Sequence, residues 1–135
     1  MDWQTVQAPT IDEFEILARN ALNGLPQRFR ALCVGVNMRI EELPSDEICE
    51  ELGLESPFEL TGLYQGVDLL QKSEAEIAPL PDMIVLYRRP ILDEWSEGGL
   101  SLGALVRHVL VHEIGHHFGF TDSDMDAIEA LEAGQ

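Results

Sequence analysis

Two histidines and one glutamate in the C-terminal part of the sequence have the residue types and the spacing of a metal site. The segment His112-Glu113-Ile114-Gly115-His116 follows the pattern HExxH. In a helix, residues four positions apart lie about one turn apart on one face, so both imidazoles can reach one ion. The glutamate between them then lies where it can contact a metal-bound water instead of the metal. The pattern therefore predicts metal-assisted hydrolysis with Glu113 as the general base.

A third protein ligand must come from outside this pair, because a catalytic zinc ion usually has three protein ligands and one water. Downstream of the motif, Gly119 allows the sharp turn that ends a helix and reverses the chain. Asp122 then lies where a returning ligand is needed, and Asp124 is the nearest alternative. Since imidazole and carboxylate ligands suit zinc, we expect a carboxylate to complete a Zn²⁺ site.

The other histidines are less suited to this site, although all four fall between residues 108 and 117. His108 and His116 would be about 12 Å apart along a helix, which is too far for one zinc ion to bind both. His108 could pair with His112 instead, but only the pair His112 and His116 encloses a glutamate. His117 lies about 100° round the helix from His116 and is expected to pack or to support the site. The expected zinc ligands are therefore His112, His116 and Asp122, with Glu113 as the base.

Capping signals place the HExxH segment on a helix in the C-terminal half of the chain. Ser101 is suited to cap a helix that runs from about 102 to 118 and ends at Gly119. Thr10 and Glu13 form a capping-box pattern at the start of an earlier helix. Apolar periodicity and further start and stop residues indicate three more helices. The expected helices cover residues 11–22, 46–52, 90–95, 102–118 and 123–133.

Three segments have the alternation or the dense apolar content of β-strands. They cover residues 29–40, 60–69 and 83–87, and an acidic stretch at 72–76 is expected to be a loop. The order of elements is one helix, one strand, one helix, two strands and three helices. This order predicts an α+β fold in which a small mixed or antiparallel sheet of about three strands packs with helices. The length predicts a single domain over residues 1–135.

The charge balance limits the partners of this chain. Eight Lys and Arg residues stand against 25 Asp and Glu residues, for a formal net charge of -17. Such a surface repels phosphate backbones and anionic lipid headgroups, which disfavours nucleic-acid and membrane partners. We see no basic region followed by an apolar stretch at the N-terminus, and the apolar segment 100–111 is too short to span a bilayer. The expected location is therefore the cytoplasm.

The metal motif and its surroundings resemble a known family. The run His112-Glu113-x-x-His116-x-x-Gly119-x-x-Asp122 resembles the extended zincin signature of the metzincin type, with Asp in place of the usual third histidine. The whole chain is more similar to the minimal zincin-like metallopeptidases, a family of small bacterial proteins. The similar segments cover residues 63–67, 80–82, 87–91 and 111–119. The resemblance implies a zincin-like fold, with the HExxH helix beside a small sheet, and metallopeptidase activity.

Together these observations predict a zinc-dependent metallopeptidase that hydrolyses peptide bonds with a zinc-activated water. Glu113 would take the proton of that water and pass it to the leaving amine. The expected partner is a peptide or protein substrate, which could pair in extended form with a strand edge near Leu63 or Ile84. Tyr64 could line the cleft or stabilise an oxyanion, but a half-buried strand tyrosine is the simpler interpretation.

Two other classes of function remain compatible with the sequence. One is a non-catalytic zinc-binding protein with a regulatory or interaction role, which would bind zinc without turning over peptides. The other is a different zinc hydrolase, such as the small bacterial endoribonucleases that use three histidines. Those enzymes lack the HExxH glutamate and need a basic RNA-binding surface, so this chain departs from them on both counts. Small HExxH proteins that cleave repressors are a closer rival within the peptidases.

Overall fold

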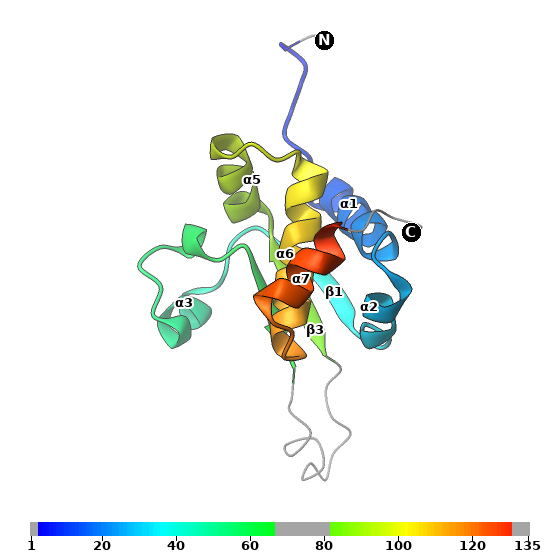
Figure 1. The fold of residues 1–135 in the computed structure, drawn as a ribbon. Coiled ribbons are helices and arrows are strands. Elements are labelled where there is room, and N and C mark those ends of the chain that lie inside the picture. Colours follow the sequence, from blue (N-terminus) through cyan, green and yellow to red (C-terminus); the bar gives the residue numbers. More distant parts are fainter. Residues whose placement is uncertain (1–2, 67–81, 131–135) are drawn as a thin grey trace.

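The computed structural model describes residues 3–66 and 82–130 (Figure 1). In chain order, the α-helices are α1 (Ile11–Asn23), α2 (Gln27–Leu32), α3 (Asp46–Leu52), α5 (Arg88–Glu97), α6 (Leu102–His117) and α7 (Asp122–Ala130). A short 3-10 helix, η1, covers Pro57–Glu59, and the strands are β1 (Asn37–Glu41), β2 (Gly62–Gln65) and β3 (Met83–Tyr87). The predicted α+β class is therefore confirmed.

The sheet has three strands in the order β1-β3-β2. β1 pairs with β3 in parallel, and β2 pairs with β3 in antiparallel orientation, with Tyr64 opposite Ile84. Four of the five residues of β3 are buried, which explains the dense apolar run that predicted this strand. The sheet is thus mixed, and β2 is an edge strand in the described part of the chain.

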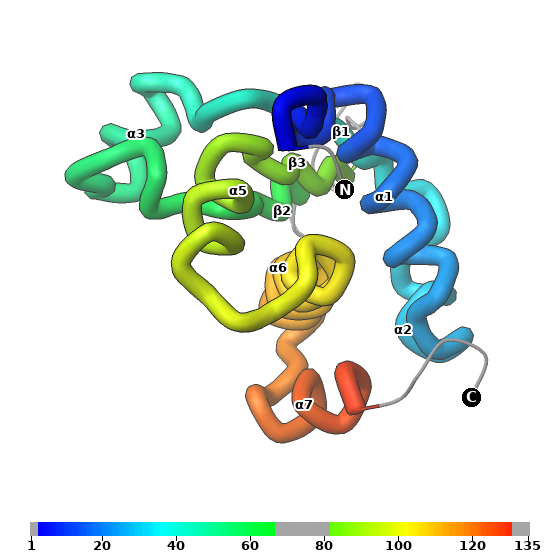
Figure 2. The backbone as a smooth tube through the Cα atoms, turned by 90° about the horizontal axis from the view of Figure 1, so that it is seen from above, coloured from blue at the N-terminus to red at the C-terminus, as the bar shows by residue number. Residues whose placement is uncertain are grey.

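Helix α6 lies between the sheet and α7, with α1 beside it (Figure 2). The Ser101 hydroxyl caps its start by accepting a 3.2 Å hydrogen bond from the backbone N–H of Ala104. Its end is followed by Gly119, whose φ of 78° is the left-handed conformation that favours glycine. The predicted helix and both of its end signals are confirmed. None of the helices in the two described ranges is long and apolar enough to cross a membrane.

Most of the other predicted elements are also confirmed. Thr10 and Glu13 form both hydrogen bonds of the predicted capping box. The expected helices 11–22 and 46–52 and the strand 83–87 correspond to α1, α3 and β3, and the expected helix 90–95 is part of the longer α5. The remaining expectations extend beyond the described residues. They are the end of strand 60–69, the loop 72–76 and the end of helix 123–133, which lie partly or wholly in 67–81 and 131–135.

The prediction of one strand over residues 29–40 is wrong, because the first part of this segment is helical. The carbonyl oxygen of Pro26 accepts hydrogen bonds from the backbone N–H groups of Phe29 and Arg30, which starts the short helix α2. Gly35, with a φ of 83°, then forms a turn before β1 begins. The buried side chain of Phe29 packs edge-on against Phe120, with ring centroids 5.8 Å apart. Tertiary packing and the turn thus override the local alternation of apolar residues.

Gly115 sets the close approach of α7 to α6. A Cβ atom at this position would lie 2.6 Å from the Sδ atom of Met125, and the Met125 side chain is fully buried. At Gly103, on the same helix, a Cβ atom would lie 3.7 Å from the nearest atom, a Cδ1 of Leu17, which is an ordinary contact.

We therefore expect Gly115→Ala to be less stable than Gly103→Ala. Both substitutions gain a similar helix propensity, so the difference between them isolates the cost of overpacking, which is about 1–3 kcal/mol. The free energies of unfolding of the two variants, measured by urea denaturation, test this expectation. Equal stabilities would contradict the close contact between α6 and α7.

Candidate metal centre

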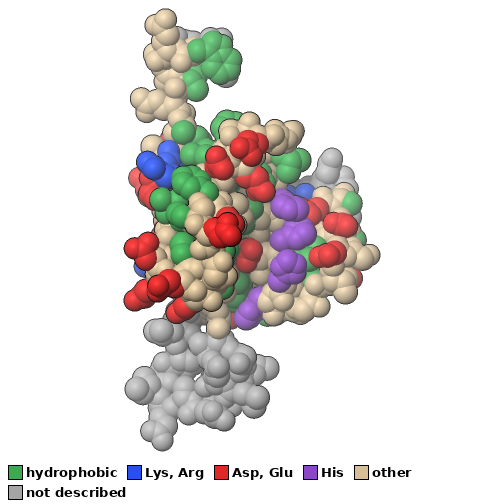
Figure 3. Space-filling view, turned by 90° about the vertical axis from the view of Figure 1, so that its left-hand side faces the viewer, with side chains coloured by type: hydrophobic (Ala, Val, Ile, Leu, Met, Phe, Trp, Pro, Cys, Tyr) green, Lys and Arg blue, Asp and Glu red, His purple; other side chains and the backbone are tan. Residues whose placement is uncertain are grey.

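The HExxH segment forms the last turns of α6, with its histidines on one face and buried residues on another. The imidazole centroids of His108 and His112 are 4.1 Å apart, and those of His112 and His116 are 5.7 Å apart. Ile114 and Gly115 are buried. The four-residue spacing therefore produces one stripe of histidines along α6, which Figure 3 shows with acidic side chains beside it.

The three expected zinc ligands come together at the end of this stripe. One ligand atom from each of His112, His116 and Asp122 lies within 4.8 Å of the other two. The Nε2 atom of His116 is 3.9 Å from the Oδ1 atom of Asp122. The chain turns back after Gly119, and the backbone N–H of Phe120 donates a 2.8 Å hydrogen bond to the carbonyl of Gly115. This turn brings Asp122, the first residue of α7, back toward the motif.

Asp124, the alternative third ligand, has a different environment. Its Oδ2 atom accepts a 3.0 Å hydrogen bond from the backbone N–H of Thr121, and its own N–H donates to the Thr121 hydroxyl. The bonds to Thr121 lower the pKa of the Asp124 carboxyl. Among the described residues, one cluster able to hold a metal contains Asp122, and none contains Asp124. The structure thus gives Asp124 a role at the start of α7.

Glu113 is half-buried between α6 and the edge strand β2. Burial raises the pKa of its carboxyl, while the nearby His116 and a hydrogen bond from the backbone N–H of Tyr64 oppose that rise. β2 approaches α6 closely at Gly62, where a Cβ atom would lie 2.8 Å from Cγ1 of Val109 and 3.2 Å from Cγ of Glu113. The absence of a side chain at Gly62 therefore lets the Glu113 carboxyl reach β2.

Tyr64 ties β2 to the end of α6. Its hydroxyl donates a 2.9 Å hydrogen bond to Oδ2 of Asp82, and its ring stacks on the imidazole of His117 at a centroid distance of 3.8 Å. Burial and the bond to Asp82 raise the pKa of the Tyr64 hydroxyl. These contacts favour the interpretation of Tyr64 as a half-buried strand tyrosine and of His117 as a packing residue.

Replacing Tyr64 by Phe is expected to affect stability and not metal binding. The substitution removes the hydrogen bond to Asp82, which should lower the free energy of unfolding by about 1–2 kcal/mol, but it keeps the aromatic ring. Zinc affinity, measured by competition with a chromophoric chelator, should stay within about threefold of the wild-type value, far less than the change caused by loss of a ligand. A loss of zinc affinity without a loss of stability would instead assign Tyr64 to the metal site.

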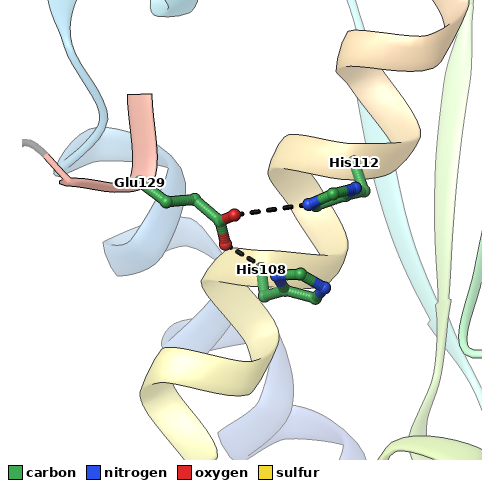
Figure 4. A group of neighbouring side chains, drawn as sticks. All are labelled: His108, His112 and Glu129. Carbon is green, nitrogen blue, oxygen red and sulfur yellow. Dashed lines mark hydrogen bonds and ion pairs between the residues drawn. The ribbon is translucent and has the colours of Figure 1, made fainter. Parts of the chain in front are cut away.

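Glu129, near the end of α7, is a candidate ligand that the sequence analysis missed. Its carboxylate lies 2.7 Å from Nδ1 of His108 and 3.3 Å from Nε2 of His112 (Figure 4). Glu129 and Asp122 are seven residues apart, so a helix places both on the same face, toward the histidines. This spacing is the one signal in the sequence that could have identified Glu129.

Helix α6, which carries the HExxH motif, packs on a small mixed sheet beside its antiparallel edge strand β2. This arrangement is expected of a zincin-like protein. The sequence profile of the zincin-like metallopeptidases matches residues 33–131, from before β1 to the end of α7. The chain therefore belongs to the zincin-like metallopeptidase family, as its sequence motifs predicted. The match includes the whole histidine stripe and both acidic residues of α7 that approach it. Family membership implies a metallopeptidase-type fold and zinc binding.

One solved structure supports the same fold. It is a conserved hypothetical protein from Thermus thermophilus, which is 23% identical in sequence and has a TM-score of 0.50. The match covers 81% of this chain and 94% of that protein. At this level of identity the similarity extends to the fold and not to activity. No curated protein has a significant match to the chain.

Proposed function

We propose that this protein is a zinc-dependent metallopeptidase, with His112, His116 and Asp122 as the zinc ligands and Glu113 as the general base. The observation that carries the proposal is the convergence of these three ligands within 4.8 Å, beside a half-buried glutamate. Two imidazole nitrogens and one carboxylate oxygen are a donor set that catalytic zinc sites use, with a fourth position left open. The side chains of His116 and Asp122 are 59% and 88% exposed, so a substrate can reach the cluster.

The environment of Glu113 suits a proton carrier. When bound, zinc supplies a Lewis acid that polarises the scissile carbonyl and acidifies the attacking water. Glu113 takes the proton from this water and delivers it to the leaving amine. Burial raises the pKa of Glu113, which makes its carboxylate a stronger base than an exposed one. The backbone N–H of Tyr64 holds that carboxylate in place beside β2.

The edge strand β2 is the surface on which we expect an extended peptide to bind. Ile84, one of the two positions considered from the sequence, lies in the central strand β3, whereas Leu63 lies in β2. The backbone of β2 at Tyr64 faces Glu113. A peptide that adds to this edge by main-chain hydrogen bonds would therefore bring its backbone close to the base.

The partners that we propose follow from charge. A net charge of -17 disfavours nucleic acid, and it disfavours an anionic membrane surface for the same reason. We therefore propose a peptide or protein substrate.

A chelation experiment tests the function. The protein is incubated with a broad peptide library in three forms: zinc-loaded, stripped with a chelator, and stripped and then reloaded with Zn²⁺. Mass spectrometry detects new peptide ends. We expect cleavage by the zinc-loaded and reloaded forms and none by the stripped form. Full zinc occupancy without cleavage of any peptide would contradict the proposal and favour the non-catalytic zinc-binding alternative.

A further inference from the structure

A second cluster of metal-binding side chains adjoins the site described above. The carboxylate of Glu129 faces both His108 and His112, with Oε1 at 2.7 Å from Nδ1 of His108 and Oε2 at 3.3 Å from Nε2 of His112 (Figure 4). One ligand atom from each of the three residues lies within 4.8 Å of the other two. The two imidazoles come from consecutive turns of α6, and the carboxylate comes from α7.

We propose that His108, His112 and Glu129 form a second coordination position for a zinc-class divalent ion. His112 is common to both clusters. A neutral imidazole has one nitrogen free to bind a metal, so His112 can serve only one position at a time. The two clusters are thus alternative positions for a single ion.

Three features support this second coordination position. The first is the donor set, because two imidazoles and one carboxylate are ligands that zinc takes. The second is spacing, since Zn–ligand bonds of about 2.0–2.1 Å place neighbouring ligand atoms roughly 3–4 Å apart, and the contacts of Glu129 are close to that range. The third is partial burial of two ligands: the side chains of His112 and Glu129 are 23% and 21% exposed, whereas that of His108 is 45% exposed.

Arg107 holds the backbone of Glu129 in position. The guanidinium of Arg107 donates a 2.9 Å hydrogen bond to the backbone carbonyl of Glu129 and a 3.2 Å bond to the carbonyl of Ile128. These bonds attach the end of α7 to α6. The Glu129 carboxylate contacts the two imidazoles from this attached end of α7.

The second position keeps the ion away from the catalytic end of the stripe. His108 lies one turn before His112, whereas His116 lies one turn after it, and it is His116 that acts electrostatically on Glu113. An ion on His108, His112 and Glu129 is therefore retained by the protein, but without His116. We call this second coordination position the resting position. The inference rests on the proposed function, because the resting position shares His112 with the proposed catalytic site, although zinc can bind there without peptidase activity.

Zinc affinity of single and double variants tests the inference, with the full chain and Zn²⁺ alone in competition with a chromophoric chelator. Loss of one ligand from a three-ligand position costs on the order of a hundredfold in affinity. We expect His116→Ala to bind zinc within about tenfold of the wild type, because the second position is intact. The double variant His108→Ala/His116→Ala should lose about a hundredfold or more, since neither position keeps three ligands.

Glu129 is tested in the His116→Ala background, with circular dichroism to verify folding. Glu129→Gln should cause about a hundredfold further loss, while Asp126→Asn, a matched change at an exposed carboxylate of α7, should cause none. The inference is overturned if a folded His116→Ala protein loses zinc as severely as the double variant does. That result would leave the peptidase proposal intact. Conversely, zinc binding at both positions without cleavage of any peptide would contradict the peptidase proposal and leave the second position intact.

Discussion

Glu113→Gln is expected to lose nearly all peptide hydrolysis while its zinc content stays at the wild-type level. The amide has almost the same volume as the carboxyl, and its oxygen can still accept the hydrogen bond from the backbone N–H of Tyr64. What it lacks is the ability to take a proton. General acid–base catalysis contributes about 10²–10⁴-fold, so the cleavage rate should fall by that factor, or by about 3–5 kcal/mol in activation free energy.

Initial rates and zinc per chain, measured on the same preparation, provide the readout for Glu113→Gln. Glu97→Gln, a matched change at the exposed end of α5, is the control and should keep the wild-type rate. A fully zinc-loaded Glu113→Gln protein that cleaves at the wild-type rate would remove Glu113 from the mechanism. Loss of zinc together with activity would instead indicate that Glu113 acts on the metal site.

The second large effect is expected at His112, because it is the one residue present in both candidate metal clusters of the described chain. His112→Ala leaves only two candidate ligands in either position. Zinc binding should therefore weaken by about a hundredfold or more, which is a larger loss than that of His108→Ala or His116→Ala alone. Peptide cleavage should fall to background at limiting zinc.

His117→Ala is the control for His112→Ala, since His117 lies on the same helix but stacks on Tyr64 and belongs to neither cluster. It should keep the wild-type zinc affinity. Equal affinities for His112→Ala and the wild type would show that the ion binds elsewhere, and wild-type cleavage by a zinc-free His112→Ala protein would exclude metal catalysis.

The part of the site that the sequence predicted is the part that local signals encode. Ser101 and Gly119 mark the two ends of α6, and the spacing of His112 and His116 follows from the helix pitch. The return of Asp122 follows from the turn at Gly119. Each of these inferences depends on residues that are close together in the sequence.

The features that the sequence did not predict depend on packing between distant segments. The approach of Glu129 to His108 requires α7 to lie across α6, which depends on the contact between Gly115 and Met125 and on the anchoring by Arg107. The parallel pairing of β1 with β3 likewise joins segments more than 40 residues apart. The helix α2 was missed because apolar alternation and a short amphipathic helix give similar patterns over six residues.

The most direct test of the metal centre is a crystal structure of the zinc-loaded wild-type protein, with anomalous diffraction recorded at the zinc absorption edge. We predict an anomalous peak about 2.0–2.1 Å from a ring nitrogen of both His112 and His116 and at a similar distance from an Asp122 carboxylate oxygen. Occupancy shared with the position formed by His108, His112 and Glu129 is consistent with this prediction. The absence of zinc density at His116 and Asp122, wherever else the ion is found, would contradict the assigned catalytic site.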